Sequence, residues 1–224
     1  MKNSVAFPHL QKAKMLTDLS QDDKADFLNR CTARTYESPE ILLHQGAQSP
    51  GIFLVAHGRI DVLMTGPQGE QTLLAHLGTG DTAGEIECIS GETCIATCRA
   101  QALATVLFCP TEVVFEFLRA PLFIRNVASV FRSRMAADNA VKALDQHGSL
   151  DQRLFLRLRT LCDGRDRVRA NQAHLAAILG CSRQSVNKAL GRLRADGIID
   201  VAKGEVRILK PDSLHDTLAD LSGD

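Results

Sequence analysis

The chain has 224 residues, of which 45% are hydrophobic and 23% are charged, and its formal net charge at pH 7 is zero. This composition is ordinary for globular domains and excludes wholesale disorder, and the length allows two modest domains. The apolar runs are far too short for a membrane span, and the N-terminal residues lack the apolar core of a secretory signal. We therefore expect a cytoplasmic protein, and seven cysteines without the spacing of a disulfide framework agree with that location.

The first part of the chain changes from helical to strand-like periodicity at Tyr36. Apolar residues recur at helical intervals over residues 10–35, with a helix start signal at residues 20–23. After Tyr36, turn clusters rich in Gly and Pro separate short segments rich in β-formers, at 41–44, 52–57, 59–65 and 72–77. A further strand pair is predicted at 94–100 and 104–109. Strands at this spacing indicate a small antiparallel barrel or sandwich.

A long helix is predicted over residues 121–147, opened by Pro121 and ended by the His147-Gly148 break. Seven residues recur in steps of four and three, the pattern of a two-stranded coiled-coil seam: Phe123, Val127, Val130, Arg134, Ala137, Val141 and Leu144. A second apolar stripe, which we expect to pack on the barrel, consists of Ile124, Phe131 and Met135. Arg134 fits a register-setting position but weakens the heptad assignment. The same pattern also fits one amphipathic helix buried within a monomer.

Residues 171–193 are predicted to form two short helices joined by a tight turn. Asn171 can cap the first helix, Gly180 stands where that helix must end in a left-handed conformation, and Ser182 can cap the second. Apolar residues of the second helix return to the core, which leaves four polar ones outside at its start: Arg183, Gln184, Asn187 and Lys188. In a helix-turn-helix these positions reach base edges, where Arg pairs with guanine and Gln or Asn with adenine. The alternative is an ordinary helical hairpin with a solvated polar face.

The segments around this stretch complete a basic, winged module. Ser149 and Gln152 form a capping box that starts a preceding helix, whose buried face would consist of Leu150, Leu154, Leu158 and Leu161. Residues 198–201 and 206–209 flank a Lys203-Gly204 turn and predict a β-hairpin, on which Lys203 and Arg207 would contact phosphate. Residues 149–210 carry 13 Lys or Arg against 6 Asp or Glu, whereas residues 1–148 carry 13 against 16. This positive charge lies where a DNA backbone would need it, although a solvated surface can show the same bias.

The run LGCSRQSVNKALGRLRADGII resembles the recognition motif of the cyclic-AMP receptor and FNR (CRP/FNR) family of bacterial transcription regulators. The resemblance extends over nearly the whole chain and implies a two-domain α+β fold. It implies a sensory, cyclic-nucleotide-binding-like antiparallel β-roll over residues 1–120, a dimerisation helix over 121–147 and a winged helix-turn-helix domain over 148–224. It further implies a homodimer on an inverted-repeat operator in double-stranded DNA, contact with RNA polymerase if the protein is an activator, and no membrane association.

By position, the resemblance assigns base contacts to Arg183, Gln184 and Lys188 and places Ser182 and Ser185 nearer the phosphates. Family members often have Glu at the position of Gln184 and Arg at that of Lys188. Glu accepts a hydrogen bond from cytosine, whereas Gln also donates. We therefore expect the half-site to depart from the commonest family sequence.

The family's phosphate-binding cassette reads roughly Gly-Glu-hydrophobic-Ala and, several residues later, Arg-Ser-Ala. Gly84, Glu85 and Ile86 match its start, but Cys94 and Ile95 replace the Arg and Ser before Ala96. Glu87 adds a second carboxylate, which we expect on the same extended segment as Glu85 and on the same face. Because a buried phosphate needs charge-assisted donors, we expect neither cyclic AMP nor cyclic GMP to bind. The alternative is a cyclic-nucleotide-responsive regulator with a divergent pocket.

The effector is left open by the sequence. The resemblance places Asp138 and Asn139 of the long helix against it, at the start of a switch that re-aims the DNA domains about Gly148-Ser149. Cys88, Cys94 and Cys98 fall in or beside the cassette, and Cys109 ends the next predicted strand. These cysteines are either a thiol or metal sensor or, as we favour, small hydrophobes of the core. We expect Cys94 and Cys98 on one strand, too far apart for a direct disulfide.

The cysteines and histidines of the chain also bear on two metal-containing cofactors. An FNR-type iron–sulfur cluster is not expected, because Cys31 stands alone in the first 87 residues. Haem stays open, since four histidines are candidate axial ligands without a spacing that selects one: His9, His44, His57 and His76. No metal ligands are assigned.

The function class follows from what the chain carries and lacks. It has no Ser-His-Asp context, no HExxH and no P-loop, so we do not expect an enzyme. A third possible class is a cyclic-nucleotide-binding module that regulates a partner protein. The basic winged helix argues against this class. The sequence therefore predicts a homodimeric DNA-binding transcription regulator that responds to redox state, to a gas through haem or to another small molecule.

Overall fold

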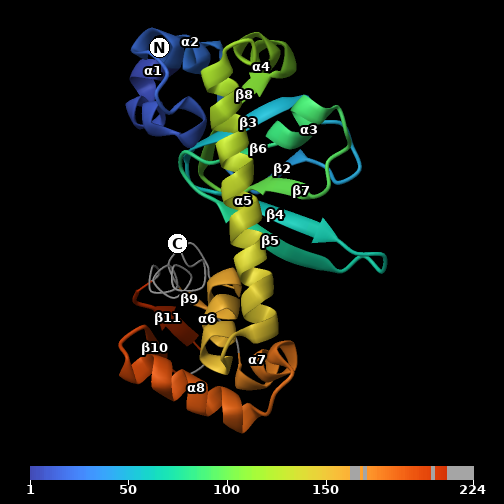
Figure 1. Cartoon of the computed structure of the whole chain (residues 1–224), viewed down its shortest axis with the longest axis vertical. Helices are drawn as coiled ribbons and strands as arrows, with labels where there is room; N and C mark the ends of the chain where they lie inside the picture. Colours follow the sequence, from blue (N-terminus) through green and yellow to red (C-terminus); the bar gives the residue numbers. More distant parts are fainter. Residues whose placement is uncertain (162–166, 169–170, 203–204, 211–224) are drawn as a thin grey trace. The chain divides into compact units, whose positions relative to one another are not determined.

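The computed structural model describes residues 1–161, 167–168, 171–202 and 205–210. It divides into two compact units, Met1–Arg134 and Met135–Asp224 (Figure 1). The boundary between these units falls inside helix α5 (Pro121–His147), which has the bounds predicted for the long helix. The division into functional domains at residues 120 and 147 stays a prediction. In the described part of the chain, no helix is long and apolar enough to cross a membrane.

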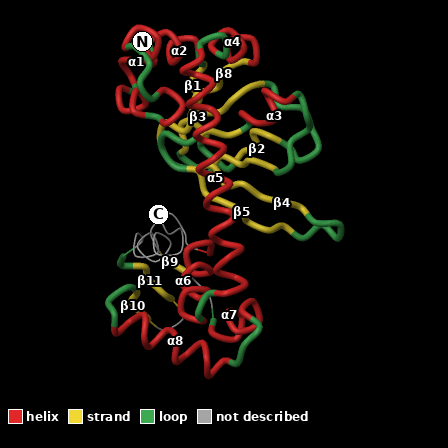
Figure 2. The backbone as a smooth tube through the Cα atoms, in the orientation of Figure 1, coloured by secondary structure: helices red, strands yellow, loops and turns green. Residues whose placement is uncertain are grey.

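The strands of the first unit form two antiparallel sheets, ordered β1-β8-β3-β6 and β2-β7-β4-β5 (Figure 2). Their bounds are β1 (Thr32–Tyr36), β2 (Glu40–Leu43), β3 (Gly51–His57), β4 (Ile60–Thr65), β5 (Gln71–Leu77), β6 (Thr82–Ala83), β7 (Thr97–Ala100) and β8 (Ala104–Pro110). The predicted β-roll is confirmed, but the predicted pairing of its last two strands is wrong. Strand β7 pairs with β2 and β4, whereas β8 pairs with β1 and β3, so consecutive strands enter different sheets.

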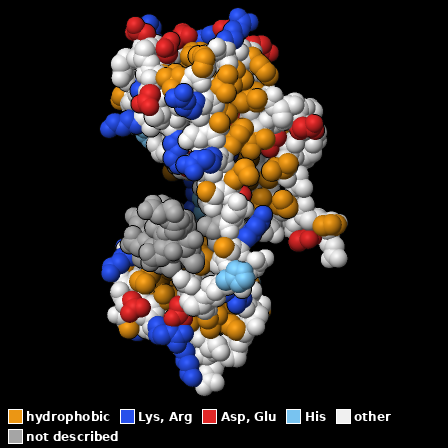
Figure 3. Space-filling model, viewed as in Figure 1, with side chains coloured by type: hydrophobic (Ala, Val, Ile, Leu, Met, Phe, Trp, Pro, Cys, Tyr) orange, Lys and Arg blue, Asp and Glu red, His pale blue; other side chains and the backbone are white. Residues whose placement is uncertain are grey.

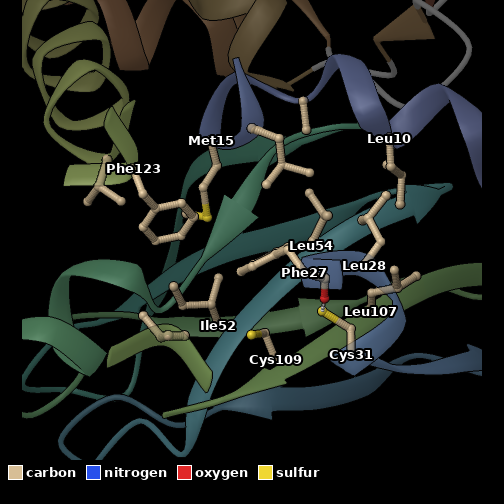
Figure 4. Close-up of a cluster of buried hydrophobic side chains, with 14 of the residues drawn as sticks. Leu10, Met15, Phe27, Leu28, Cys31, Ile52, Leu54, Leu107, Cys109 and Phe123 are labelled. Atoms are coloured by element: carbon tan, nitrogen blue, oxygen red, sulfur yellow. Dashed lines mark hydrogen bonds between the residues drawn. The ribbon is translucent and has the colours of Figure 1, made fainter. Parts of the chain in front are cut away.

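Strand β3 is buried on both faces and separates two cores. Phe53 and Val55 face the space between the sheets, where every strand of the roll contributes at least one buried residue. Ile52 and Leu54 alternate with them and face a second cluster, shared with the N-terminal helices and α5 (Figure 4). Because alternate side chains of β3 point to opposite faces, one set packs between the two sheets and the other set packs against the helices.

The helix predicted over residues 10–35 is replaced by shorter elements. They are α1 (Asn3–Ala6), the 3₁₀ helices η1 (Pro8–Lys12) and η2 (Lys14–Leu16), and α2 (Gln21–Arg30), after which β1 begins. The start signal is confirmed, because the Ser20 hydroxyl accepts a hydrogen bond from the Asp23 N–H at 3.1 Å. Strand β1 was missed because only Tyr36 of its residues is buried, so its sequence lacks the alternation of a half-buried strand.

Helix α5 follows α4 (Thr111–Phe117). The start of the stripe that was predicted to face a partner helix is buried in the first unit, and the stripe that was predicted to pack on the barrel is largely exposed. Phe123 and Val127 are 0% and 4% exposed and pack in the cluster with Met15 (Figure 4), whereas Ile124 and Met135 are 49% and 64% exposed. The first half of the predicted coiled-coil seam is therefore part of the unit's own core. The side chains of Ala137 and Val141 lie outside those that the structure describes.

The second unit contains α6 (Leu150–Leu161), β9 (Arg167–Val168), α7 (Gln172–Leu179), α8 (Arg183–Ala195), β10 (Ile199–Ala202) and β11 (Glu205–Ile208). The capping box is confirmed, with the Ser149 N–H donating to Gln152 Oε1 at 2.8 Å and the Gln152 N–H to Ser149 Oγ at 3.3 Å. Leu154 and Leu158 are buried as predicted, but Leu161 is exposed, and Phe155 is buried with them. The predicted hairpin β10–β11 is extended by β9, a strand that the polar sequence around it did not indicate.

Candidate DNA-binding helix and effector site

Local hydrogen bonds fix the turn between α7 and α8 as the sequence predicted. The Asn171 side chain accepts from the His174 N–H at 2.8 Å, and the Ser182 hydroxyl accepts from the Ser185 N–H at 3.0 Å. Between the helices, Gly180 has φ 62°, the left-handed conformation that ends α7. The helix-turn-helix geometry therefore follows from three residues at its ends.

Helix α8 buries one side and leaves its polar start in solvent. Val186 and Leu190 are buried in the unit's core. On the other side, the residues that the sequence assigned to base edges are all exposed, and their side chains make no hydrogen bond or ion pair with another described residue: Arg183, Gln184, Asn187 and Lys188. Ser185 is half-buried, with its hydroxyl 2.8 Å from that of Ser182. Four hydrogen-bonding side chains are thus free to meet a ligand along one helix start.

Two arginines that the sequence did not single out hold the helix-turn-helix on α6. Arg192 of α8 makes a bidentate pair with Asp151 of α6, with both N···O distances at 2.6 Å. Arg153 of α6 donates to the carbonyl of Leu179 at 2.8 Å and so satisfies a terminal carbonyl of α7. In the wing, Arg207 is exposed on β11, and Lys203 lies outside the described residues.

The cassette segment forms a short helix, α3 (Glu85–Ser90), rather than an extended segment. Gly84 precedes it with φ 82°, and a Cβ there would lie 2.9 Å from the carbonyl oxygen of Gly51. Because residues two apart on a helix point to different sides, Glu85 is fully buried whereas Glu87 is half-buried and Ile86 is exposed. The prediction that both carboxylates share one face is therefore wrong.

Arg134 of α5 is not a free seam residue, because its guanidinium binds the cassette. It forms an ion pair with Oε1 of Glu85 and donates to the carbonyl of Thr82. Oε2 of Glu85 and Oγ1 of Thr82 are both buried without a hydrogen-bond partner among the described residues. Burial raises the pKa of Glu85 above its usual value, and the charge of Arg134 opposes that rise. The sequence missed this contact because its two ends are 49 residues apart.

The positions that replace the family's Arg and Ser differ in exposure. Cys94 is buried with Ala96, while Ile95 between them is 67% exposed, with its N–H 3.5 Å from Oε1 of Glu87. Cys94 lies before β7 and only Cys98 lies in it, so the prediction that both share one strand is wrong. Burial, followed by the charge of Glu87, raises the pKa of the Cys94 thiol and raises that of Cys98 to about 12. Both are therefore neutral thiols near pH 7, which supports their role as small hydrophobes.

The remaining candidates are not gathered at this site. Asp138 and Asn139 are exposed on α5, one turn beyond Arg134, and their effector contact stays a prediction. His44 and His57 are exposed. His9 Nε2 lies 2.9 Å from the Ala56 carbonyl, and His76 Nδ1 lies 2.7 Å from Asp61 Oδ1. The described residues contain no cluster of three or more His, Cys, Asp or Glu that could hold a metal, and haem ligation stays open.

Comparisons with known proteins find a family model that matches one stretch in each of the two units. Residues 33–120 match the Cyclic nucleotide-binding domain, and residues 152–217 match the Crp-like helix-turn-helix domain. The Cyclic AMP receptor protein of Thermus thermophilus is 25% identical over 178 residues, which cover 78% of this chain and 82% of that protein. The HTH-type transcriptional regulator Cmr of Mycobacterium tuberculosis is 27% identical over 193 residues, which cover 85% of this chain and 78% of that protein.

Solved structures agree on the fold. The Thermus thermophilus Catabolite Activator Protein superposes with a TM-score of 0.52 at 22% identity, covering 94% of this chain and all of that one. The c-di-GMP responsive global regulator CLP of Xanthomonas campestris gives a TM-score of 0.56 at 16% identity, covering 80% and 94%. At these identities the likeness is one of fold.

Proposed function

This chain is a DNA-binding transcription regulator of the CRP/FNR type, and we propose that it reads an inverted repeat as a homodimer. Its homologues are transcription regulators rather than enzymes. The observation that carries the proposal is the start of α8, where four exposed polar side chains follow a capped turn. In a helix-turn-helix, these positions enter the major groove.

Each side chain at the start of α8 has a distinct role in this proposal. Arg183 makes a bidentate contact with guanine, and Gln184, Asn187 and Lys188 contact the neighbouring bases. Ser182 and Ser185 lie on the phosphate side, with Lys203 of the wing also on phosphate. The 13 Lys or Arg of residues 149–210 supply the counterion release that makes the affinity depend on salt.

The dimer contact that we propose uses the exposed stripe of α5 instead of the predicted seam. Ile124, Ala128, Phe131 and Met135 recur in steps of four, three and four, and all but the half-buried Phe131 are exposed. This spacing suits a two-stranded helix pair. Apolar side chains gather over this face of the first unit (Figure 3). If the regulator is an activator, RNA polymerase is a further partner.

The effector site, in this proposal, has lost its cyclic nucleotide. Cys94 and Ile95 offer no charged donor to a phosphate, and the guanidinium of Arg134 is already bound to Glu85. One observation favours a second candidate, a cyclic-nucleotide-responsive regulator with a divergent pocket. Among the described residues, Oε2 of the buried Glu85 lies within hydrogen-bond distance of no donor, which suits a ribose hydroxyl.

The base-reading role is tested with Arg183→Ala, using fluorescence anisotropy on a bound genomic fragment and on its single-base variants. Loss of a bidentate guanine contact should cost about 1–3 kcal/mol and relax preference at one base pair per half-site. Arg194→Ala is the matched control, because it removes the same charge from the exposed far end of α8. An Arg183→Ala protein that bound every sequence more weakly by the same factor would contradict the assigned role.

A further inference from the structure

We propose that Cys31 and Cys109 form a redox site, a pair of thiols that a hydroperoxide converts to an intramolecular disulfide. The pair joins the end of α2 to β8 in the core of the first unit. The proposal deepens the proposed function, because it names oxidation as a signal for the same regulator. It rests on that function only for the effect on DNA.

The register of the first sheet places the two cysteines opposite each other. Thr32 of β1 pairs with Phe108 of β8, and the extended backbone of Cys31, with φ −81° and ψ 153°, continues β1 by one residue. The next antiparallel partners are therefore Cys31 and Cys109. Residues directly opposite each other have Cα atoms about 4.5–5.5 Å apart, within the range of about 4.4–6.8 Å that a disulfide spans.

The two side chains also meet in the core. Figure 4 shows them next to each other in the cluster that they share with Phe27 and Ile52. Cys31 and Cys109 are 6% and 1% exposed, and both are free cysteines. A hydrogen bond between the two thiols is the largest cause that raises the pKa of Cys31. The sulfurs are therefore neighbours before any bond forms.

Cys88 is a second thiol near Cys109, but its contacts differ. The Cys88 thiol donates to Oγ1 of Thr111 at 3.5 Å, and Cys109 acts on its pKa through charge and not through a hydrogen bond. The sequence grouped Cys109 with the cassette cysteines, whereas the structure gives its thiol a partner at the end of α2. Cys31 is therefore the partner that we assign to Cys109.

Cys31 gives the pair access to solvent. It is one of the residues that line an open hollow of about 650 Å³ beside β1, together with Asn3, Asn29 and Thr32. The Asn3 amide donates to the carbonyl of Cys31 at 2.7 Å and so holds its backbone in place. A hydroperoxide is small enough to enter from the hollow. Cys31 is therefore the thiol that reacts first, and the more deeply buried Cys109 reacts second.

The oxidation takes two steps, and its electrons come to balance with one hydroperoxide. The Cys31 thiolate attacks the terminal peroxide oxygen, the O–O bond breaks, and a sulfenic acid and an alcohol form, or water where the oxidant is hydrogen peroxide. The Cys109 thiol then attacks the sulfenic sulfur. The S–S bond forms, the S–O bond breaks, and the thiol proton leaves with the hydroxide as water. The two thiols lose two electrons, and the peroxide gains them.

This reaction should be slow near neutral pH, because the thiolate is the reacting form. The hydrogen bond with Cys109 and burial raise the pKa of Cys31, and the charge of Arg30 opposes them only in part. The pair therefore responds to sustained oxidation rather than to a brief pulse.

A disulfide at this position acts on α5 through a shared core. The cluster that holds both sulfurs also holds Phe123 and Val127 of α5. The bond draws the end of α2 and β8 closer than two separate thiols can lie, and a close-packed core transmits that change to its neighbours. Because α5 is the proposed dimer helix, oxidation shifts the population of arrangements in which two copies of α8 meet DNA.

Peptide mapping tests the bond itself. The full chain is incubated with excess hydrogen peroxide at about pH 8.5, the ordinary pKa of a thiol, its remaining thiols are alkylated, and trypsin cleaves it without reduction. Trypsin releases Cys31 on residues 31–34 and Cys109 on residues 100–119, whereas the three cassette cysteines share residues 60–99. Mass spectrometry should find 31–34 linked to 100–119, with the loss of two hydrogens and with separation on reduction by dithiothreitol.

Cys31→Ala and Cys109→Ala should each abolish the linked peptide. Cys98→Ala is the matched control, because Cys98 is 7% exposed in the other core of the first unit, and it should leave the linkage unchanged. Oxidised wild type should unfold at a higher urea concentration than reduced wild type, since the bond closes a long loop of the unfolded chain. Absence of the linked peptide, linkage of Cys109 to Cys88 or a lower urea midpoint after oxidation would overturn the pair.

Fluorescence anisotropy on a bound genomic fragment tests the effect on DNA. Oxidation should change the affinity of wild type and of Cys98→Ala by about fivefold or more, and that of Cys31→Ala should not change. Cys31→Ala retains the half-buried Cys181 of the turn before α8, so it reports any effect of oxidation there. Equal affinities of oxidised and reduced wild type, or equal responses of wild type and Cys31→Ala, would overturn the regulatory role. The peptide map does not depend on DNA, so failure of the redox site and failure of the proposed function are told apart.

Discussion

Single residues set the geometry around Glu85, and Gly84 is the clearest. Its φ of 82° lies in the left-handed region, and a Cβ would meet the carbonyl oxygen of Gly51, the side chain of Leu43 and the hydroxyl of Ser49, each at 2.9 Å. Gly91, at the other end of α3, has φ 73° but nothing within 4 Å of its Cβ position. Both glycines therefore have the left-handed conformation, but an added Cβ would meet close neighbours only at Gly84.

Gly84→Ala should therefore destabilise the first unit more than Gly91→Ala. Forcing a side chain into the left-handed region costs about 1–2 kcal/mol at either position, and crowding adds about 1–3 kcal/mol at Gly84 alone. Urea unfolding of both variants measures the difference. Equal losses would mean that the backbone at Gly84 shifts freely to admit a methyl group.

Glu85 gives the stability a pH dependence whose sign can be worked out. Burial raises the pKa of Glu85 above its usual 4.5. As the pH rises past the usual value, the unfolded chain releases this proton while the folded chain keeps it, so stability from Glu85 is lost up to the raised pKa. Glu85→Gln does not titrate. The free energy of unfolding of the variant minus that of wild type should therefore increase as the pH rises from the usual pKa of a glutamate to the raised pKa of Glu85.

Denaturant unfolding at several pH values measures this difference. Glu85→Gln also leaves Arg134 without its ion pair, but that loss shifts the difference in free energy by a constant and does not change its dependence on pH. A difference that fell or stayed flat would show that Glu85 titrates at or below its usual pKa. Glu87→Gln, in which the half-buried neighbour is changed, serves as the control for a change of surface charge.

The residue roles that the sequence predicted correctly depend on near neighbours in the chain. Asn171, Ser182 and Gly180 were assigned correctly because a cap or a left-handed turn depends on neighbours within three residues. The partner of Glu85 could not be assigned, because Arg134 comes from a distant helix and periodicity does not specify which face meets which element.

Among the secondary-structure elements, α5 shows that a sequence can reveal an apolar stripe without revealing which element packs against it. Both apolar stripes were visible in the sequence, and either could face the roll. The structure buries Phe123 and Val127 and anchors the same face with Asn126, whose amide donates to the carbonyls of Met15 and Thr17 at 3.1 and 2.6 Å. The pairing of β7 and β8 was missed for the same reason, since alternation identifies a strand but not its neighbours.

Phe123 and Ile124 are adjacent residues with opposite expected effects. Phe123→Ala removes a fully buried ring and should lower the free energy of unfolding by about 3–5 kcal/mol. Ile124→Ala, at a position 49% exposed, should change that quantity by about 0.5 kcal/mol or less in a monomeric unit and weaken self-association instead. Denaturant unfolding at low protein concentration and sedimentation equilibrium separate the two quantities. A wild-type level of association in Ile124→Ala would remove this stripe from the dimer contact.

In the whole molecule, two units with separate cores carry the two candidate sites. The roll holds the buried carboxylate site and the second unit holds the exposed helix start, while α5 contributes residues to both cores: Phe123 to the first and Leu144 to the second. The excess of basic over acidic residues is confined to residues 149–210, although the net charge of the chain is zero. DNA affinity should therefore come from the second unit, and specificity from two copies of α8 held by α5.

The reading of an inverted repeat by a homodimer can be tested by changing the phasing of the two half-sites on DNA. A bound genomic fragment is trimmed to its two half-sites, and the spacing between their centres is lengthened by about half a turn or about one full turn of DNA. Analytical ultracentrifugation should find two chains on the natural site. Anisotropy should show that the half-turn insertion weakens binding to the level of one half-site. One chain per duplex, with an affinity that does not depend on the spacing, would show that the protein does not read an inverted repeat as a homodimer.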